Sequence, residues 1–147
     1  MLRLLISAML FSLPAFTIAQ SIKINYISKV PVKMQQCGAQ YTYDTSSLKK
    51  KQYIMLADFQ NLGMISINGK LISLQLKDSK LSDTKMNIAT YTGGGYIVIT
   101  TLKTIRQTKQ ADYEEGLLEV SKGKEKISIR IHGQSACDES KAEGNGP

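Results

Sequence analysis

The sequence predicts an all-β protein: a single small antiparallel meander barrel of seven to eight strands, closed by one disulfide. Three observations carry this prediction. Apolar and polar residues alternate with a period of two in several short runs, as they do in half-buried strands. Glycine-containing turns separate these runs at close intervals. The chain of 147 residues holds two cysteines and 42% apolar residues, which suits one domain with a modest core.

The N-terminal segment has the layout of a secretory signal peptide. A short positive start, Met1–Arg3, precedes an apolar run over residues 4–16, and Thr17–Ala19 ends it with the small-x-small pattern of a cleavage site. The run is too short for a transmembrane helix. We expect cleavage after Ala19, and Gln20 in place of a cysteine means that no lipid anchor attaches there. The alternative is a buried N-terminal helix of a cytosolic protein.

This layout divides the chain into a signal peptide over residues 1–19, a β-barrel domain over residues 20–137 and a disordered polar tail over residues 138–147. It places the mature protein in the periplasm or outside the cell. In such an oxidising compartment two cysteines most often form one disulfide, so we expect Cys37 to pair with Cys137. A redox-active pair is the alternative, but that chemistry usually uses a Cys-x-x-Cys spacing, which the chain lacks.

The first half of the chain predicts short strands and one ambiguous stretch. Alternation at period two predicts strands over residues 22–26 and 39–43. Residues 47–63 fit a helix capped by Ser47 and ended by Gly63, because apolar residues there fall near helical spacing. They also fit a strand over Gln52–Phe59. We favour the strand because everything that follows predicts a meander.

Three hairpins follow. Residues 64–76 form two alternating runs around Asn68-Gly69, a turn in which both residues tolerate a positive φ. The second hairpin joins residues 86–91 to 96–105 through residues 92–95. The third joins residues 116–120 to 127–131 through residues 121–124, with the isoleucines of the last strand on one side.

No motif predicts an enzyme. His132 is the one candidate for a neutral-pH base, and it lies on the strand face opposite the isoleucines, where we expect solvent exposure. Ser135 lacks the second glycine and the strand-to-helix turn of a nucleophile elbow. A Ser-His-acid triad is formally available, but we predict that the protein is not an enzyme.

No motif predicts a cofactor or a metal either. The glycines of residues 92–96 lack the lysine and the following helix of a phosphate-binding loop. Asp112, Glu114 and Glu115 form an acidic cluster that is able to hold Ca²⁺, but it lacks the regular ligand pattern of such sites. We interpret it as a solvated loop.

The charge balance constrains the partner. The chain has 19 Lys and Arg against 12 Asp and Glu, a net charge of +7, and seven tyrosines. A barrel with lysines and tyrosines also suits nucleic acid, but export disfavours that partner. An anionic envelope surface or an acidic protein suits the same charge, as does a cationic surface that is merely solvated.

Several segments together resemble the membrane-bound and periplasmic inhibitors of c-type lysozyme. These segments are the early Cys37, residues 68–74 (NGKLISL), residues 91–96 (YTGGGY) and the closing residues 133–137 (GQSAC). The resemblance implies an eight-stranded antiparallel barrel that links an early cysteine to a terminal one. It also implies an inhibitory loop with the motif Ser-Gly-x-x-Tyr, whose Ser and Tyr engage the catalytic carboxylates of lysozyme.

The motif fits this chain in two ways. Thr92-Gly93-x-x-Tyr96 matches it with Thr in place of Ser, which keeps a hydroxyl, and an alignment on the following turn places Tyr91 on the motif tyrosine. The resemblance therefore implies a non-enzymatic binding protein that uses Thr92, Gly93, Tyr96 and Tyr91 to plug the cleft of a lysozyme or other cell-wall hydrolase. A barrel that uses a face of lysines and tyrosines for an envelope contact, a ligand or an immunity function is the alternative.

Overall fold

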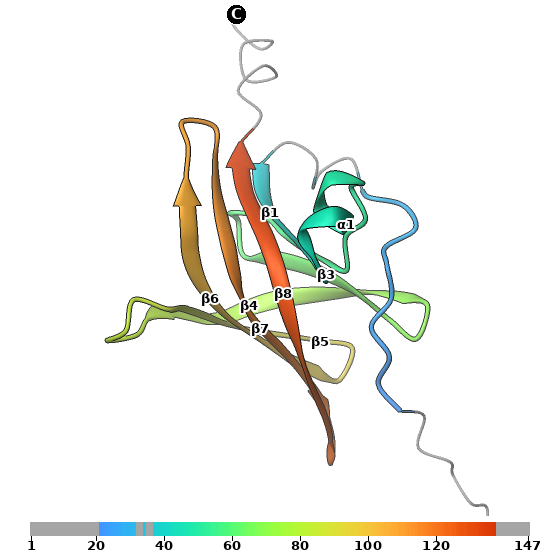
Figure 1. Cartoon of the computed structure of the whole chain (residues 1–147). Helices are drawn as coiled ribbons and strands as arrows, with labels where there is room; N and C mark the ends of the chain where they lie inside the picture. The colour runs from blue at the N-terminus through green and yellow to red at the C-terminus, as the bar shows by residue number, and fades with distance from the viewer. Residues whose placement is uncertain (1–20, 32–33, 35–36, 138–147) are drawn as a thin grey trace, which may run out of the picture.

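The described part of the chain folds into one closed β-barrel (Figure 1). The computed structural model describes residues 21–31, 34 and 37–137, so the predicted signal peptide and tail lie outside the described residues. The described elements are, in order, β1 (Cys37–Thr42), α1 (Thr45–Lys49), β2 (Met55–Ala57), β3 (Leu62–Ile67), β4 (Lys70–Leu81), β5 (Asn87–Gly93), β6 (Tyr96–Gln107), β7 (Ala111–Lys122) and β8 (Glu125–Cys137). Each strand pairs antiparallel with the next, which confirms the predicted meander.

The first and last strands close the barrel. β1 pairs with β8 from Cys37 opposite Cys137 to Thr42 opposite His132. A disulfide joins Cys37 to Cys137, and the described residues include no free cysteine. The predicted disulfide is therefore confirmed, and it is consistent with an oxidising, exported location.

Two of the three predicted hairpin turns are tighter than the sequence predicts. The turn at Asn68-Gly69 is confirmed, with positive φ values of 51° and 75°. The β5–β6 turn consists only of Gly94 and Gly95, with φ values of 57° and 79°. Two positive φ values match the twist of the flanking strands, so pairing continues up to the turn.

The four-residue turns predicted at residues 92–95 and 121–124 are therefore wrong by two residues each. Thr92 and Gly93 belong to β5, and Ser121 and Lys122 belong to β7.

The predicted strand over residues 22–26 is also wrong. Its alternation is real, because Ile22 and Ile24 are buried in the core. The segment makes only an isolated bridge, between Ile24 and Ile67. The three-residue β2 pairs with β3 only as far as Ile65. The N-terminal segment therefore contacts β3 only at the short stretch of free edge beyond Ile65, which is too short for a strand to form.

Residues 47–63 contain both predicted alternatives in shortened form. The favoured strand over Gln52–Phe59 shrinks to β2, and a five-residue helix, α1, precedes it. The helix cap is Asp44 and not Ser47, because the Asp44 side chain accepts a hydrogen bond from the backbone N–H of Ser47. Within the part of the chain that the structure describes, no helix is long and apolar enough to cross a membrane.

Alternate side chains of the strands fill the barrel. The fully buried members at its centre are Met55, Ile65, Ile67, Leu74, Val98, Leu118, Val120 and Ile131. Two buried tyrosines occupy space that glycines leave free. A Cβ at Gly133 would collide with the Tyr41 ring, and one at Gly63 would lie 3.3 Å from the Tyr91 ring. The tyrosine bodies therefore complete the core where a larger neighbour does not fit.

Antiparallel order gives the barrel two different ends. The disulfide end carries Cys37, Cys137 and the connections at residues 58–61, 82–86 and 108–110. The turn end carries the two-residue turns at residues 68–69, 94–95 and 123–124. At the disulfide end, the last register pair of β5 and β6 is Asn87 opposite Leu102. β6 and β7 continue to pair beyond this level, as far as Gln107 opposite Asp112. The β4–β5 and β6–β7 hairpins diverge there (Figure 1).

We expect the double variant Cys37→Ala, Cys137→Ala to lose about 4–5 kcal/mol of unfolding free energy, because the bridge closes a sequence separation of 100 residues in the unfolded chain. Urea unfolding of the variant and the parent measures this. A loss below about 1 kcal/mol would mean that the remaining β1–β8 pairing closes the barrel unaided.

We expect Gly93→Ala to cost about 1–3 kcal/mol, because a Cβ there would collide with the backbone carbonyl of Ser73 on β4. Urea unfolding again provides the measurement. Thr92→Ala on the opposite face of the same strand is the control, and equal losses in the two variants would contradict the proposed collision.

Candidate functional site

The residues implied to bind a partner lie on the β5–β6 hairpin but do not share a face. Tyr91 is buried inside the barrel with 8% of its surface exposed. Thr92 follows it in the strand and is half-buried on the outer face. Gly93 pairs with Tyr96, whose ring is half-buried on the inner face and packs against the core. Thr92 and Tyr96 therefore lie on opposite faces of the hairpin.

A cation covers the Tyr96 ring at the turn end. The Nζ of Lys122 lies 4.7 Å from the ring centroid, within the range of a cation–π contact. The Lys122 side chain also lies beside Gly95, where a Cβ would be 3.4 Å from its Cε. We call Gly94, Gly95, Tyr96 and Lys122 the tip. Lys122 lies 26 positions from Tyr96 in the numbering, so no local pattern indicates the contact.

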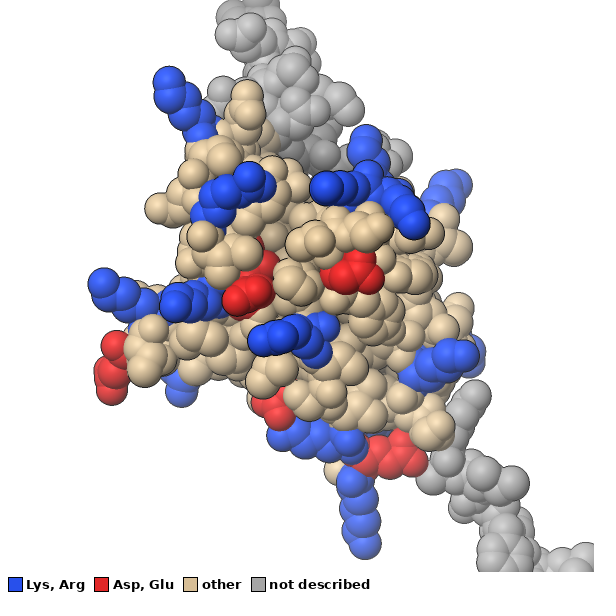
Figure 2. Space-filling view, viewed as in Figure 1, with Lys and Arg blue, Asp and Glu red and all other residues tan. Residues whose placement is uncertain are grey.

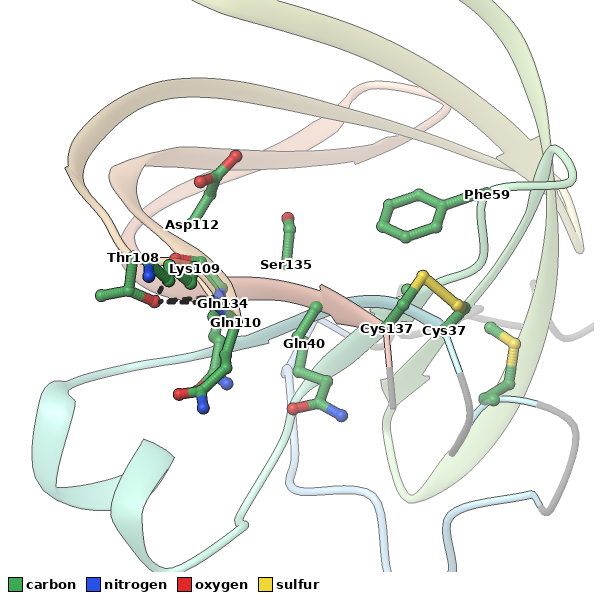
Figure 3. A pocket seen from close by; sticks show the side chains of 14 residues that line it. Cys37, Gln40, Phe59, Thr108, Lys109, Gln110, Asp112, Gln134, Ser135 and Cys137 are labelled. Atoms are coloured by element: carbon green, nitrogen blue, oxygen red, sulfur yellow. Dashed lines mark hydrogen bonds between the residues drawn. A yellow bond between two sulfur atoms is a disulfide. The ribbon is translucent and has the colours of Figure 1, made fainter. Parts of the chain in front are cut away.

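A second candidate site is a pocket at the disulfide end, the rim pocket, with a volume of about 900 Å³. It is lined by Met34, Cys37, Gly38, Gln40, Phe59, Thr108, Lys109, Gln110, Ala111, Asp112, Gln134, Ser135, Ala136 and Cys137. In Figure 3, Phe59, Asp112 and Ser135 stand on one side of β8, whereas the three glutamines extend on the other. The pocket therefore crosses the barrel rim.

A buried carboxylate lies behind Ser135. Glu114 is 8% exposed and accepts a hydrogen bond from the Ser135 hydroxyl to Oε2 at 3.2 Å. Burial raises the pKa of Glu114, and nearby Asp112 raises it further, against the opposing hydrogen bonds from Ser135 and Asn87. The interpretation of this acidic cluster as a solvated loop is wrong, because Asp112, Glu114 and Glu115 all belong to β7.

Two tyrosine hydroxyls share this environment. Burial is the main cause that raises the pKa of Tyr41 well above its usual value, and the Glu114 charge and Tyr91 add to it. Burial also raises the pKa of Tyr91, with contributions from Asp58 and Glu114. Both phenols therefore stay protonated at neutral pH. The period-two pattern that places Glu114 on the same face as Leu118 was the available sequence signal for this cluster.

The structure separates the residues of the formal triad. Ser135 and His132 are three positions apart on β8, so their side chains lie on opposite faces, and Ser135 bonds to Glu114 instead. His132 is half-buried and not solvent-exposed as expected, and its Nδ1 is buried without a hydrogen-bond partner among the described residues. Within the described ranges, no cluster of His, Cys, Asp and Glu is able to hold a metal ion.

The basic side chains do not gather beside one set of tyrosines. Figure 2 shows Lys and Arg spread over the visible face with a few acidic residues between them. Tyr41, Tyr53 and Tyr91 are buried. Besides the tip, the described residues contain one other cation–π contact, Arg106 at 3.9 Å from the Tyr113 ring centroid. β6 and β7 bring that contact to the disulfide end, so the two pairs lie at opposite ends of the barrel.

Comparisons of the chain with family models, curated proteins and solved structures find no match.

We expect Glu114→Gln to change the pH dependence of stability in a defined direction. A carboxyl group whose pKa is raised on folding binds its proton more tightly in the folded state than in the unfolded state. Its contribution to the free energy of unfolding therefore grows as the pH falls toward 4.5, the pKa of the group in the unfolded chain. The parent should therefore gain stability relative to the variant between neutral pH and pH 4.5. Urea midpoints across this range measure the difference, and parallel curves would contradict the shift.

Proposed function

We propose that this chain is an exported, non-enzymatic binding protein that inserts the tip into the cleft of a protein partner, in the manner of the lysozyme inhibitors that it resembles. The observation that carries the proposal is the Lys122 cation over the half-buried Tyr96 ring, beside a two-glycine turn. The eight-stranded barrel and its single disulfide, which the resemblance implied, add support.

The chemistry of the tip suits a hydrolase cleft. Enzymes that cleave glycosidic bonds carry a pair of carboxyl groups in a narrow groove. Lys122 offers a positive charge and Tyr96 an amphipathic ring that is partly fixed by its contact with the core. Gly94 and Gly95 are exposed and have no side chains, so the hairpin end is thin. The short turn keeps the tip ordered before binding, which lowers the entropic cost of association.

The separation of Thr92 and Tyr96 onto two faces fits an inserted hairpin. A hairpin end that enters a groove offers Thr92 from its outer face, whereas Tyr96, packed against the core on the inner face, offers the exposed part of its ring together with Lys122. Thr92 then contributes a hydroxyl hydrogen bond. Tyr91 is buried in the barrel, so its part in binding is to support the hairpin from inside.

An anionic envelope surface is the second candidate partner. It is favoured by the net charge of +7 and by the Lys and Arg side chains spread over the face shown in Figure 2. Salt separates the two candidates. Binding to an anionic surface weakens steeply as salt rises. Insertion into a basic lysozyme instead associates faster as salt screens the repulsion between two positive proteins.

We expect the mature protein to inhibit at least one member of a panel of c-, g- and i-type lysozymes at stoichiometric amounts in a cell-wall lysis assay. Lys122→Ala and Tyr96→Phe should each weaken inhibition about tenfold to a hundredfold, because each removes a hydrogen bond or charge contact to a carboxylate worth about 1.5–3 kcal/mol. Thr92→Val should weaken it less, by about fivefold. Tyr96→Phe and Thr92→Val keep the shape of the side chain, and Lys122 is exposed, so the melting curves should stay close to that of the parent.

Matched controls are Thr90→Val, on the same strand and face as Thr92, and Tyr113→Phe, at the opposite end of the barrel. Equal losses in these controls, or inhibition that is lost only together with the melting transition, would contradict insertion of the tip. Absence of inhibition across the panel would reject a lysozyme as the partner.

A further inference from the structure

We propose that the rim pocket is a binding site for a neutral oligosaccharide, separate from the tip and independent of the function proposed for it. The pocket lies at the disulfide end, whereas the tip lies at the turn end. Its volume of about 900 Å³ falls within the range of small-ligand sites, and the mouths of β-barrels are frequent places for them.

The glutamines of the pocket have unused hydrogen-bonding capacity. Gln40 and Gln134 are register partners on β1 and β8, and both are half-buried. Gln110 belongs to the β6–β7 connection and extends on the same side of the rim (Figure 3). Within the described residues, none of the three side-chain amides has a hydrogen-bond partner. An amide both donates and accepts, as the hydroxyl of a sugar does.

The inner side of the pocket adds fixed acceptors and an apolar surface. Ser135 donates its hydroxyl proton to the buried Glu114, so its oxygen lone pairs are left to accept a proton from a ligand. Asp112 stands beside it (Figure 3), and its carboxylate supplies further acceptor oxygens for the hydroxyls of a ligand. The Phe59 ring is 60% exposed on the same side. Such a ring packs against the apolar C–H face of a sugar.

The loop that carries Gln110 is held in place before binding. The Thr108 hydroxyl donates to the Ala111 carbonyl at 2.9 Å and accepts from the backbone N–H of Gln110 at 3.3 Å and of Ala111 at 3.0 Å. The disulfide fixes the ends of β1 and β8 on the other side. Little conformational entropy is therefore lost when a ligand binds.

The charges of the pocket do not favour an anionic ligand. In a chain of net charge +7, the ionisable residues that line the pocket are one lysine, Lys109, and one aspartate, Asp112, with Glu114 behind them. With one lysine and one aspartate, the lining has no excess of positive charge, so an anionic polymer would gain little there and would leave most lysines of the protein unused. A neutral chain of hydroxyls and C–H faces matches the amides, the hydroxyl, the carboxylate and the ring together.

The test is an NMR titration of the ¹⁵N-labelled protein with N-acetylchitotetraose and with maltotetraose, two neutral oligosaccharides with and without amide groups. We expect at least one of them to cause saturable shifts confined to the ends of β1, β8 and the residue 58–61 and 108–110 connections. Gln134→Ala and Phe59→Ala should each weaken the binding about tenfold. Added salt should leave the affinity unchanged because the ligand has no charge.

Gln52→Ala and Leu117→Ala are the matched controls, because they remove an exposed amide and a half-exposed apolar side chain outside the pocket. Tyr96→Phe should bind the oligosaccharide as the parent does, so failure at the tip and failure at the rim are distinguishable. No saturable shift with either sugar, or parental affinity in both Gln134→Ala and Phe59→Ala, would overturn the proposal.

Discussion

The pairing of β1 with β8 is the constraint on which the rest of the structure depends. A meander of antiparallel strands leaves two free edges unless its first and last members meet. Here they meet over six residues of β1, and the covalent bond between Cys37 and Cys137 lies at the first register pair. The disulfide and the backbone hydrogen bonds between β1 and β8 require the same register. A shift of β1 by one residue relative to β8 would therefore be incompatible with both. That register also decides which side chains of β8 enter the barrel.

The interior that this closure creates is not uniform along its length. Toward the turn end and the centre, the strands contribute fully buried aliphatic residues such as Val98, Leu118 and Ile131. Toward the disulfide end, inward positions of β1 and β7 carry Tyr41 and Glu114. Tyr91 on β5, the register partner of Val98, is close enough for the Glu114 charge to act on its hydroxyl. A carboxylate is costly to bury in a small core. The hydrogen bond from Ser135 to Glu114 offsets part of this cost. The raised pKa of Glu114 means that the group also takes up a proton, and so loses its charge, at a higher pH than an exposed carboxyl group does. Ser135 connects the two regions, because it bonds to the buried Glu114 and also lines the rim pocket.

The sequence predicts the parts of this fold that depend on local pattern. Asn68-Gly69 predicts its turn because the positive φ is a property of those two residues, and alternating isoleucines predict β8 because burial on one strand face has a period of two. The predictions are wrong where residues far away in the sequence determine whether a segment forms a strand. Residues 22–24 alternate between buried and exposed side chains as a strand does. Because β2 occupies most of the adjacent edge of β3, the segment makes only the single bridge between Ile24 and Ile67.

The candidate sites show the same division. Residues 91–96 were found from the sequence because they are contiguous, whereas Lys122 joins them through strand pairing alone. The rim pocket was missed altogether, because its three glutamines come from β1, the β6–β7 connection and β8, and only barrel closure brings them together.

The two ends of the barrel are separated by its rigid aliphatic centre, and this has a consequence for binding. Close-packed cores deform little, so occupancy of one end does not require rearrangement of the other. The outer faces of the long strands β6, β7 and β8 connect the tip to the rim without an intervening loop. Under the two proposals, a protein is held at the turn end while a neutral glycan occupies the disulfide end. For a partner that cleaves cell-wall glycans, the two proposed activities would then meet on one polymer, with the barrel retained close to the substrate of the enzyme that it is proposed to bind.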